Sequence, residues 1–389
     1  MDKVNVALVI GLGPSGLFVT RQLANLTDKI YGIGRNDDIG LYSRFYKNGR
    51  CFIAYSIDDI CVICKQIYSL ERVKPKLFLC SDQYLTLILN HIERLSNYID
   101  FSNLDIEALS LINDKQIINK FCTRCSINIP FSLSLNDFIN SQDKQFPVII
   151  KWRKKELNQD CGKIGKTHIC NDKNQFEELL NTMEGIAPEN LIVQKYIRGD
   201  NGNQYSVGGY YKNGEKLANV VVRQIKQYPQ GVSAEVYSVE DGIAVMLDDV
   251  SMKFVKELNY TGFLEMEYKI DNMTGKYYLL DINPRPWGWV SILGAVYKDF
   301  YKCLIGQRPE CEYNRSLWKS PLRCLKARNN KQNYYLSAQE SLSNTAYDIY
   351  DKNDLKPLLL IVYVLIKKSI ETMKLYKYIK EEGLLYTIE

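Results

Sequence analysis

The sequence predicts an α/β protein, with a doubly wound N-terminal domain, a middle part built on antiparallel hairpins and a mainly helical C-terminal tail. Three observations support this. An apolar run, a glycine-rich turn and an amphipathic helix open the chain, two hairpin patterns occupy its middle, and helical patterns rich in Lys and Tyr close it. The 389 residues, 46% of them hydrophobic and 24% charged, suffice for two or three domains with full cores.

The composition narrows the class of protein. A net charge of +5, from 50 Lys and Arg against 45 Asp and Glu, is too small to favour nucleic acid and suits anionic small molecules. Eleven cysteines without a secretory signal at the start indicate free thiols and a cytoplasmic location. The longest apolar segment, residues 358–366, is too short to cross a bilayer. It leaves open a buried helix, a peripheral membrane contact through residues 355–380, or a homodimer contact.

The first domain is expected over residues 1–110. Residues 4–10 form a buried strand, Gly11, Gly13 and Gly16 form a tight turn, and residues 17–26 form a helix. A second strand, residues 29–34, ends at Arg35, where a NAD site would carry an acid, so an NADP-dependent oxidoreductase is kept as an alternative. A third strand, residues 76–80, ends at Ser81-Asp82-Gln83, at the edge that usually lines a ligand crevice.

The middle of the chain alternates helices with hairpin strands. We expect helices at 116–125, 173–183 and 251–258, and strands at 148–152, 191–197, 204–211 and 215–225. A basic, glycine-containing loop, residues 153–166, has the composition of a flap over phosphates. Beyond residue 307 we expect a short strand at 322–326 and mainly helical structure over 339–389.

The most informative stretch is the hairpin predicted over residues 262–285. Alternation places Glu265 and Glu267 on one face of the first strand and Asp281 and Asn283 on one face of the second. A turn centred on Met273 would set Glu265 opposite Asp281, and a turn centred on Thr274 would set Glu267 there. Facing carboxylates destabilise a sheet unless a cation joins them. Carboxylate and amide oxygens are ligands that suit Mg²⁺ together with substrate phosphates.

The order of these motifs resembles the ATP-grasp superfamily of ATP-dependent carboxylate–amine or carboxylate–thiol ligases. The resemblance covers about residues 1–305 and rests on the glycine turn, the strand Val193-Gln-Lys-Tyr-Ile-Arg-Gly199 and the ending Asp281-Ile-Asn-Pro-Arg285. Arg223, Gln227-Tyr-Pro and Pro286-Trp287 resemble the carbamoyl-phosphate-synthase-like and D-aspartate-ligase-like branch. It implies a Rossmann-like pre-ATP-grasp domain (1–110), a lid subdomain (111–195), a catalytic subdomain (196–310) and a mainly helical extension (311–389).

The resemblance also implies a role for each matching position. Lys115, Lys151 and Lys166 would contact the ATP phosphates, Gln194, Lys195 and Ile197 would hold adenine, and Gln204 would lie near the ribose. Glu267, Asp281 and Asn283 would bind Mg²⁺ or Mn²⁺, with Glu267 preferred to Glu265 as first ligand. Arg285 and Arg223 would stabilise the transferring phosphoryl group.

The expected function is therefore an ATP-dependent ligase that joins a small-molecule carboxylate, as an acyl phosphate, to an amine such as an amino acid. The sequence departs from the family at Gln194 and Gln204, where acids are common, and at Asp281, where Glu is commoner. A non-catalytic nucleotide-binding module is the second alternative that these departures leave open.

Overall fold

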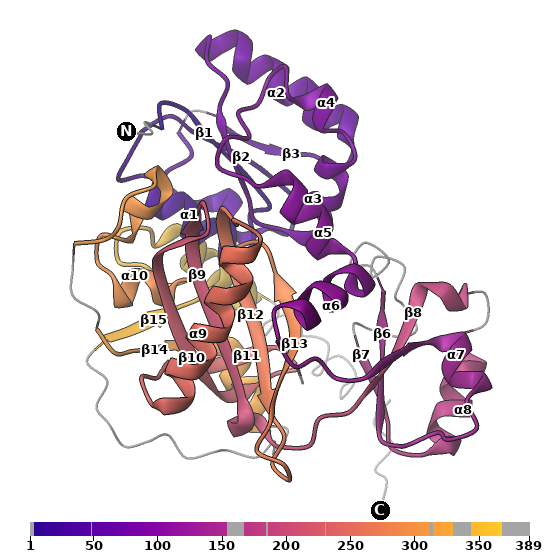
Figure 1. The fold of residues 1–389 in the computed structure, drawn as a ribbon. Helices are drawn as coiled ribbons and strands as arrows, with labels where there is room; N and C mark the ends of the chain where they lie inside the picture. Colours follow the sequence, from indigo (N-terminus) through magenta and orange to yellow (C-terminus); the bar gives the residue numbers. More distant parts are fainter. Residues whose placement is uncertain are drawn as a thin grey trace, which may run out of the picture.

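The computed structural model describes residues 4–47, 49–153, 167–183, 186–229, 231–310, 314–329 and 344–367. These residues form three sheets, each with its own helices (Figure 1). The N-terminal sheet lies above a seven-stranded sheet in this view, and a smaller sheet lies beside the latter at the right.

The N-terminal sheet is parallel, with strand order β3-β2-β1-β4. Its strands are β1 (Ala7–Ile10), β2 (Ile30–Gly34), β3 (Cys51–Ile53) and β4 (Lys76–Leu79). Its helices are α1 (Pro14–Leu23), η1 (Ile39–Tyr42), α2 (Ile57–Glu71), α3 (Asp82–Leu89), α4 (Ile92–Leu95) and α5 (Ile106–Asn113). The expected strand–turn–helix opening is confirmed. The half-exposed strand β3 was not predicted, because three residues are too short for a periodic pattern.

The smaller sheet is antiparallel, with strand order β5-β8-β6-β7. Its strands are β5 (Ser132–Ser134), β6 (Val148–Trp152), β7 (Thr167–Cys170) and β8 (Leu191–Lys195). Helices α7 (Leu135–Asn140) and α8 (Lys173–Thr182) and the turn η3 (Pro188–Asn190) belong to this part. The rings of Phe138, Phe146 and Phe176 meet edge to face in its separate core.

The seven-stranded sheet has the order β13-β12-β9-β10-β11-β14-β15 and is antiparallel except between β14 and β15. Its strands are β9 (Gln204–Lys212), β10 (Glu215–Gln227), β11 (Ser233–Ser238), β12 (Gly262–Ile270), β13 (Tyr277–Asn283), β14 (Ser316–Lys319) and β15 (Asn344–Tyr347). The remaining helices are α6 (Lys115–Arg124), η4 (Asn201–Asn203), α9 (Gly242–Glu257), α10 (Ile292–Val296), η5 (Phe300–Ile305) and α11 (Pro321–Asn329).

Each face of the seven-stranded sheet packs into a different core. Leu264, Met266 and Tyr268 of β12 share a core with Phe254 of α9. The other face contributes Val220, Val222 and Phe263 to a core that includes Trp287 and Phe18 of α1. Because side chains alternate along a strand, this second face is also the face of Glu265 and Glu267.

Two expectations for the second half of the chain are corrected, and a third gains a strand. The segment expected as a strand, residues 322–326, lies in helix α11, which begins at Pro321, a residue suited to the first turn of a helix. The tail expected to be mainly helical has, in its described part, a helix over residues 356–367 and also strand β15, which pairs with β14. Helix α9 begins well before residue 251, because Asp241 caps it by accepting a hydrogen bond from the Ala244 N–H.

The segment after β15 returns to the N-terminal domain. Asp354 is completely buried and accepts hydrogen bonds from Nε of Arg21 on α1 (3.1 Å) and from the Ser43 hydroxyl (2.8 Å). A helix continues from residue 356 to the end of the described region at 367. Within the described ranges, no helix combines the length and hydropathy that crossing a bilayer requires.

Gly208 on β9 has no side chain, and the Trp287 ring packs in the space that a side chain there would occupy. A Cβ at this position would lie 2.2 Å from the Trp287 ring, which is 1% exposed. We therefore expect Gly208→Ala to lower the free energy of unfolding by about 1–3 kcal/mol, measured by urea denaturation. Gly242→Ala is the matched control, because no atom lies within 4 Å of a Cβ there. Equal stability of the two variants would contradict this packing.

Candidate active site

The hairpin of β12 and β13 brings the expected metal ligands together. Glu267 pairs with Asp281 and Glu265 pairs with Asn283, so the register is the one in which the turn centres on Thr274. A β-bulge follows between Glu267 and Tyr268. The shared face of the four polar side chains, predicted from alternation, is confirmed.

The amide of Asn283 bridges the two glutamates. Its Nδ2 donates to Oε2 of Glu265 (2.9 Å) and to Oε1 of Glu267 (3.0 Å). Glu265 is 4% exposed, and burial, followed by the nearby charge of Glu267, raises the pKa of its carboxyl group well above the usual range. A second ionised carboxylate beside it is therefore costly without a cation.

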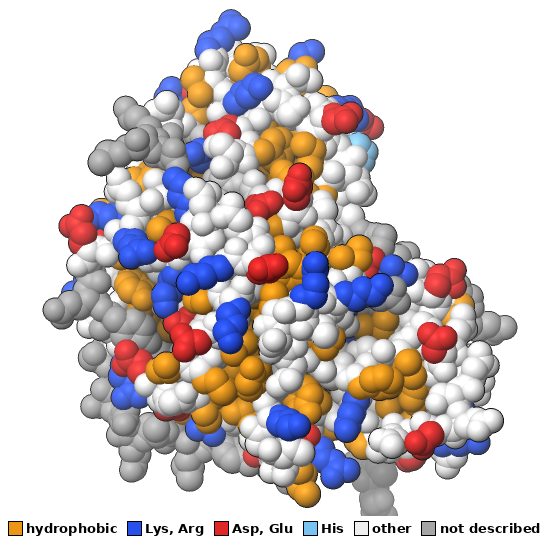
Figure 2. All heavy atoms as spheres, viewed as in Figure 1, with side chains coloured by type: hydrophobic (Ala, Val, Ile, Leu, Met, Phe, Trp, Pro, Cys, Tyr) orange, Lys and Arg blue, Asp and Glu red, His pale blue; other side chains and the backbone are white. Residues whose placement is uncertain are grey.

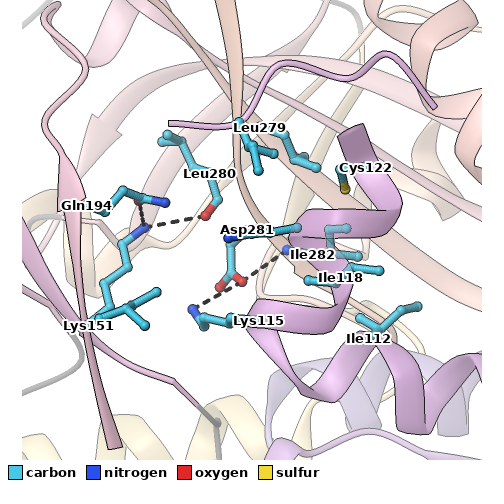
Figure 3. A pocket seen from close by; sticks show the side chains of 13 residues that line it. Ile112, Lys115, Ile118, Cys122, Lys151, Gln194, Leu279, Leu280, Asp281 and Ile282 are labelled. Atoms are coloured by element: carbon cyan, nitrogen blue, oxygen red, sulfur yellow. Dashed lines mark hydrogen bonds and ion pairs between the residues drawn. The ribbon is translucent and has the colours of Figure 1, made fainter. Parts of the chain in front are cut away.

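Two expected phosphate-binding lysines point toward this hairpin from other elements (Figure 3). Lys115, the first residue of α6, forms an ion pair with Asp281 at 3.5 Å. Lys151 on β6 donates from Nζ to Oε1 of Gln194 (2.8 Å) and more weakly to the Leu280 carbonyl (3.4 Å). Burial, and then the charge of Lys115, lower the pKa of Lys151 to about 8.

A cavity of about 30 Å³ lies between these groups. Its walls come from α5, α6, β6, β8 and β13, and they include the polar side chains of Lys115, Asn119, Lys151, Gln194 and Asp281. Ligand pockets usually measure about 300–1,000 Å³, so the cavity is smaller than a usual ligand pocket. On the face shown in Figure 2, Lys and Arg side chains also lie around α6, where the seven-stranded sheet meets the smaller sheet.

Arg285 lies just beyond the β12–β13 hairpin and contacts the N-terminal domain. Its guanidinium forms a short ion pair with Asp82, the first residue of α3, and donates from Nη1 to the Pro286 carbonyl (2.9 Å). Glu265 and Asp281 lie close enough to raise its pKa. Asp82 was expected only to line the ligand crevice. Its contact with Arg285 depends on how two domains pack, which spacing along the chain does not show.

The structure does not bring Arg223 to Arg285, and this expectation is corrected. Arg223 pairs with Tyr205 on β9, whereas its neighbour Val222 pairs with Ser206, which in turn pairs with Glu267. Arg223 therefore points to the opposite face of the sheet. There its Nε donates to the Gly202 carbonyl (2.6 Å), and its guanidinium lies over the Tyr205 ring.

Of the remaining expected nucleotide contacts, Gln194 and Lys195 lie on β8, Ile197 follows it by two residues, and Gln204 begins β9. Gln194 and Ile197 are buried, whereas the Lys195 side chain is exposed. Gln204 shares the face of Glu267 and accepts a hydrogen bond from Nε2 of Gln227 (2.8 Å). Lys166 lies outside the described residues.

The donor set fits a hard divalent cation. Among the described residues, no group of three or more His, Cys, Asp or Glu side chains is arranged as a metal site. The hairpin instead offers the carboxylates of Glu267 and Asp281 and the amide of Asn283. Such a partial shell matches Mg²⁺, which keeps waters and substrate phosphates as further ligands. Mutual repulsion of these carboxylates beside the buried Glu265 is the physical reason for a cation here.

The glycine turn, in contrast, satisfies its own backbone groups. The Leu12 N–H donates to Oδ2 of Asp38 (3.1 Å), and the Leu12 carbonyl accepts from the Gly40 N–H (2.8 Å). A Cβ at Gly16 would lie 2.0 Å from the Gly11 carbonyl oxygen. These contacts explain the glycines as a tight turn, and they favour a structural role over the pyrophosphate contact that an NADP-dependent oxidoreductase needs.

Comparison with solved structures shows the class of fold. N5-carboxyaminoimidazole synthase from Aspergillus clavatus, in complex with ADP and 5-aminoimidazole ribonucleotide, aligns with a TM-score of 0.63 and 12% identity, covering 82% of each chain. L-amino acid ligase from Bacillus licheniformis aligns with a TM-score of 0.57 and 12% identity, covering 80% of this chain and 76% of that one. The chain has the ATP-grasp fold, as the resemblance in its sequence indicated.

A curated relative lies in the expected branch. D-aspartate ligase from Enterococcus faecium (strain Aus0004) is 24% identical over 247 residues, which are 59% of this chain and 57% of that protein. The chain thus matches a little more than half the length of this relative. No family model matches the sequence.

The lowered pKa of Lys151 predicts a pH-dependent stability. An unfolded lysine titrates near pH 10.4, so between about pH 8 and 10.4 the unfolded chain binds more protons than the folded protein. The Tm of the wild type should therefore rise relative to the Tm of Lys151→Met between about pH 8 and 10.4. Below about pH 8, the difference between the two Tm values should not change with pH. Differential scanning calorimetry measures both, with Lys65→Met, at an exposed position, as control. A Tm difference between wild type and Lys151→Met that does not change between pH 8 and 10.4 would contradict the burial of the Lys151 charge.

Proposed function

We propose that this chain is an ATP-dependent ligase that joins a carboxylate to an amine. The observation that carries the proposal is the paired Glu267 and Asp281, which lie beside the Asn283 amide and near the cations Lys115 and Lys151. Phosphoryl transfer needs positioning and charge neutralisation more than a protein nucleophile, and this constellation offers both. ATP and Mg²⁺ are the proposed co-substrate and metal.

The reaction proceeds in two steps. A carboxylate oxygen of the first substrate accepts the γ-phosphoryl group, which forms an acyl phosphate and releases ADP. The amine nitrogen of the second substrate then attacks the carbonyl carbon. The C–O bond to phosphate breaks, inorganic phosphate leaves, and the nitrogen loses a proton to give the amide.

Each residue has a defined part in this scheme. Lys115 and Lys151 orient and neutralise the phosphates, and Arg285 stabilises the charge on the phosphoryl group in flight. Glu267, Asp281 and Asn283 hold the cation, while Glu265 supports them from its buried position. An amino acid is the proposed substrate class, which the name of the relative D-aspartate ligase supports.

The decisive test is ADP release with pooled amino acids and carboxylates, followed by mass spectrometry of the products. We expect Asp281→Ala and Arg285→Ala to slow ADP release by about 10²–10³-fold, because the first removes a ligand of the cation and the second removes a positive charge beside the phosphoryl group. Arg223→Gln is the control for Arg285, since Arg223 points to the other face, and it should keep wild-type activity.

Two results would contradict the proposal. Equal activity of wild type, Asp281→Ala and Arg285→Ala in an active preparation would mean that these residues take no part in the reaction. Binding of ATP and Mg²⁺ without turnover on any substrate would favour a non-catalytic nucleotide-binding module.

A further inference from the structure

The ion pair between Asp82 and Arg285 joins two distant parts of the chain. Asp82 begins α3 directly after the parallel strand β4, and Arg285 follows the hairpin strand β13 by two residues, 203 positions later. The contact therefore exists only because the N-terminal domain packs against the end of the metal-binding hairpin.

The surroundings of Arg285 distinguish this contact from an ordinary surface ion pair. The Arg285 side chain is 16% exposed, and that of Asp82 is 26% exposed. Burial lowers the pKa of Arg285, but the carboxylates of Asp82, Glu265 and Asp281 outweigh burial and raise it. One guanidinium thus lies among three carboxylates from two domains.

In this arrangement, Arg285 and a bound cation would compete for the same hairpin carboxylates. Of the three carboxylates, Asp281 is a proposed ligand of the cation, and Glu265 supports the ligands through its hydrogen bond with Asn283. A guanidinium forms strong bidentate pairs with carboxylates, so an unrestrained Arg285 would neutralise the very oxygens that a cation needs. Asp82 is the carboxylate of the three that lies outside the hairpin.

We propose that Asp82 is a positioning residue that holds Arg285 away from the hairpin carboxylates and so keeps them available to Mg²⁺. This inference rests on the proposed function and adds the N-terminal domain to the cation site. Asp82 touches neither the cation nor the phosphates in this role. It acts through Arg285, and cation affinity then depends on how the N-terminal domain packs against the hairpin.

The test is the Mg²⁺ concentration that half-saturates ADP binding, measured by isothermal titration calorimetry without any turnover. We expect Asp82→Asn to raise this concentration on the order of tenfold, the usual cost of losing a residue that orients a metal site. Asp82→Glu, which keeps the charge, should restore most of the affinity. Asp58→Asn is the matched control, because Asp58 pairs with Arg94 at 2.7 Å in the same domain, on an exposed surface.

A double variant separates positioning from a general structural role. In an Arg285→Gln background the competing guanidinium is gone, so Asp82→Asn should cause no further rise. A rise of equal size in both backgrounds, or no rise with Asp82→Asn alone, would overturn the inference. Should Asp82→Asn fail to fold, as judged by circular dichroism, Asp82→Ser gives the same comparison with a residue suited to a helix start.

The outcome for wild type separates this inference from the proposed function. Wild-type protein that binds no ADP at any Mg²⁺ concentration contradicts both. Wild-type protein that binds ADP with Mg²⁺, together with an unchanged Asp82→Asn variant, contradicts only the role of Asp82.

Discussion

The repulsion between carboxylates on one hairpin face, of which Glu265 is buried and Glu267 and Asp281 are partly exposed, is the constraint on which the rest of the site depends. Glu265 and Glu267 lie two residues apart on β12, and Asp281 pairs directly with Glu267 on β13. Sheets tolerate such neighbours only when hydrogen bonds and opposite charges offset them. All three parts of the molecule help to offset this repulsion. Helix α6 and strand β6 present Lys115 and Lys151, and the hairpin supplies the Asn283 amide. The N-terminal domain holds Arg285 through Asp82.

The packing of Trp287 against the sheet explains why these charged side chains stay in place. Gly208 lies beside Glu265 in the β9–β12 pairing, and the Trp287 ring occupies the space that a side chain there would take. Trp287 packs against Trp289 and Phe263 with ring centroids 4.9 and 6.4 Å apart. The apolar layer on the same face keeps water from part of the cluster, which strengthens both the repulsion and the attraction of the lysines.

Local patterns were sufficient to predict the opening strand–turn–helix and the hairpin. Alternation and the turn at Gly275 placed the four polar side chains on one face, but the same pattern allowed two registers. Arg223 was misplaced for a related reason. β10 is buried on both faces from Ala218 to Val222, so its sequence carries no alternation that shows which residues face the hairpin. The contact of Asp82 with Arg285 depends on domain packing, which no local pattern records.

The contacts of Gln194 and Gln204 explain why neutral amides suit positions where the resembling family commonly has acids. Gln194 accepts a hydrogen bond from Lys151 at 2.8 Å through a neutral amide. A glutamate in that place would pair with the lysine and cancel the charge that the proposed function directs at phosphate oxygens. Gln204 likewise engages Gln227 as a neutral partner. Gln194 and Asn283 thus orient charged groups without neutralising them, so the charge of Lys151 is left for an anionic ligand.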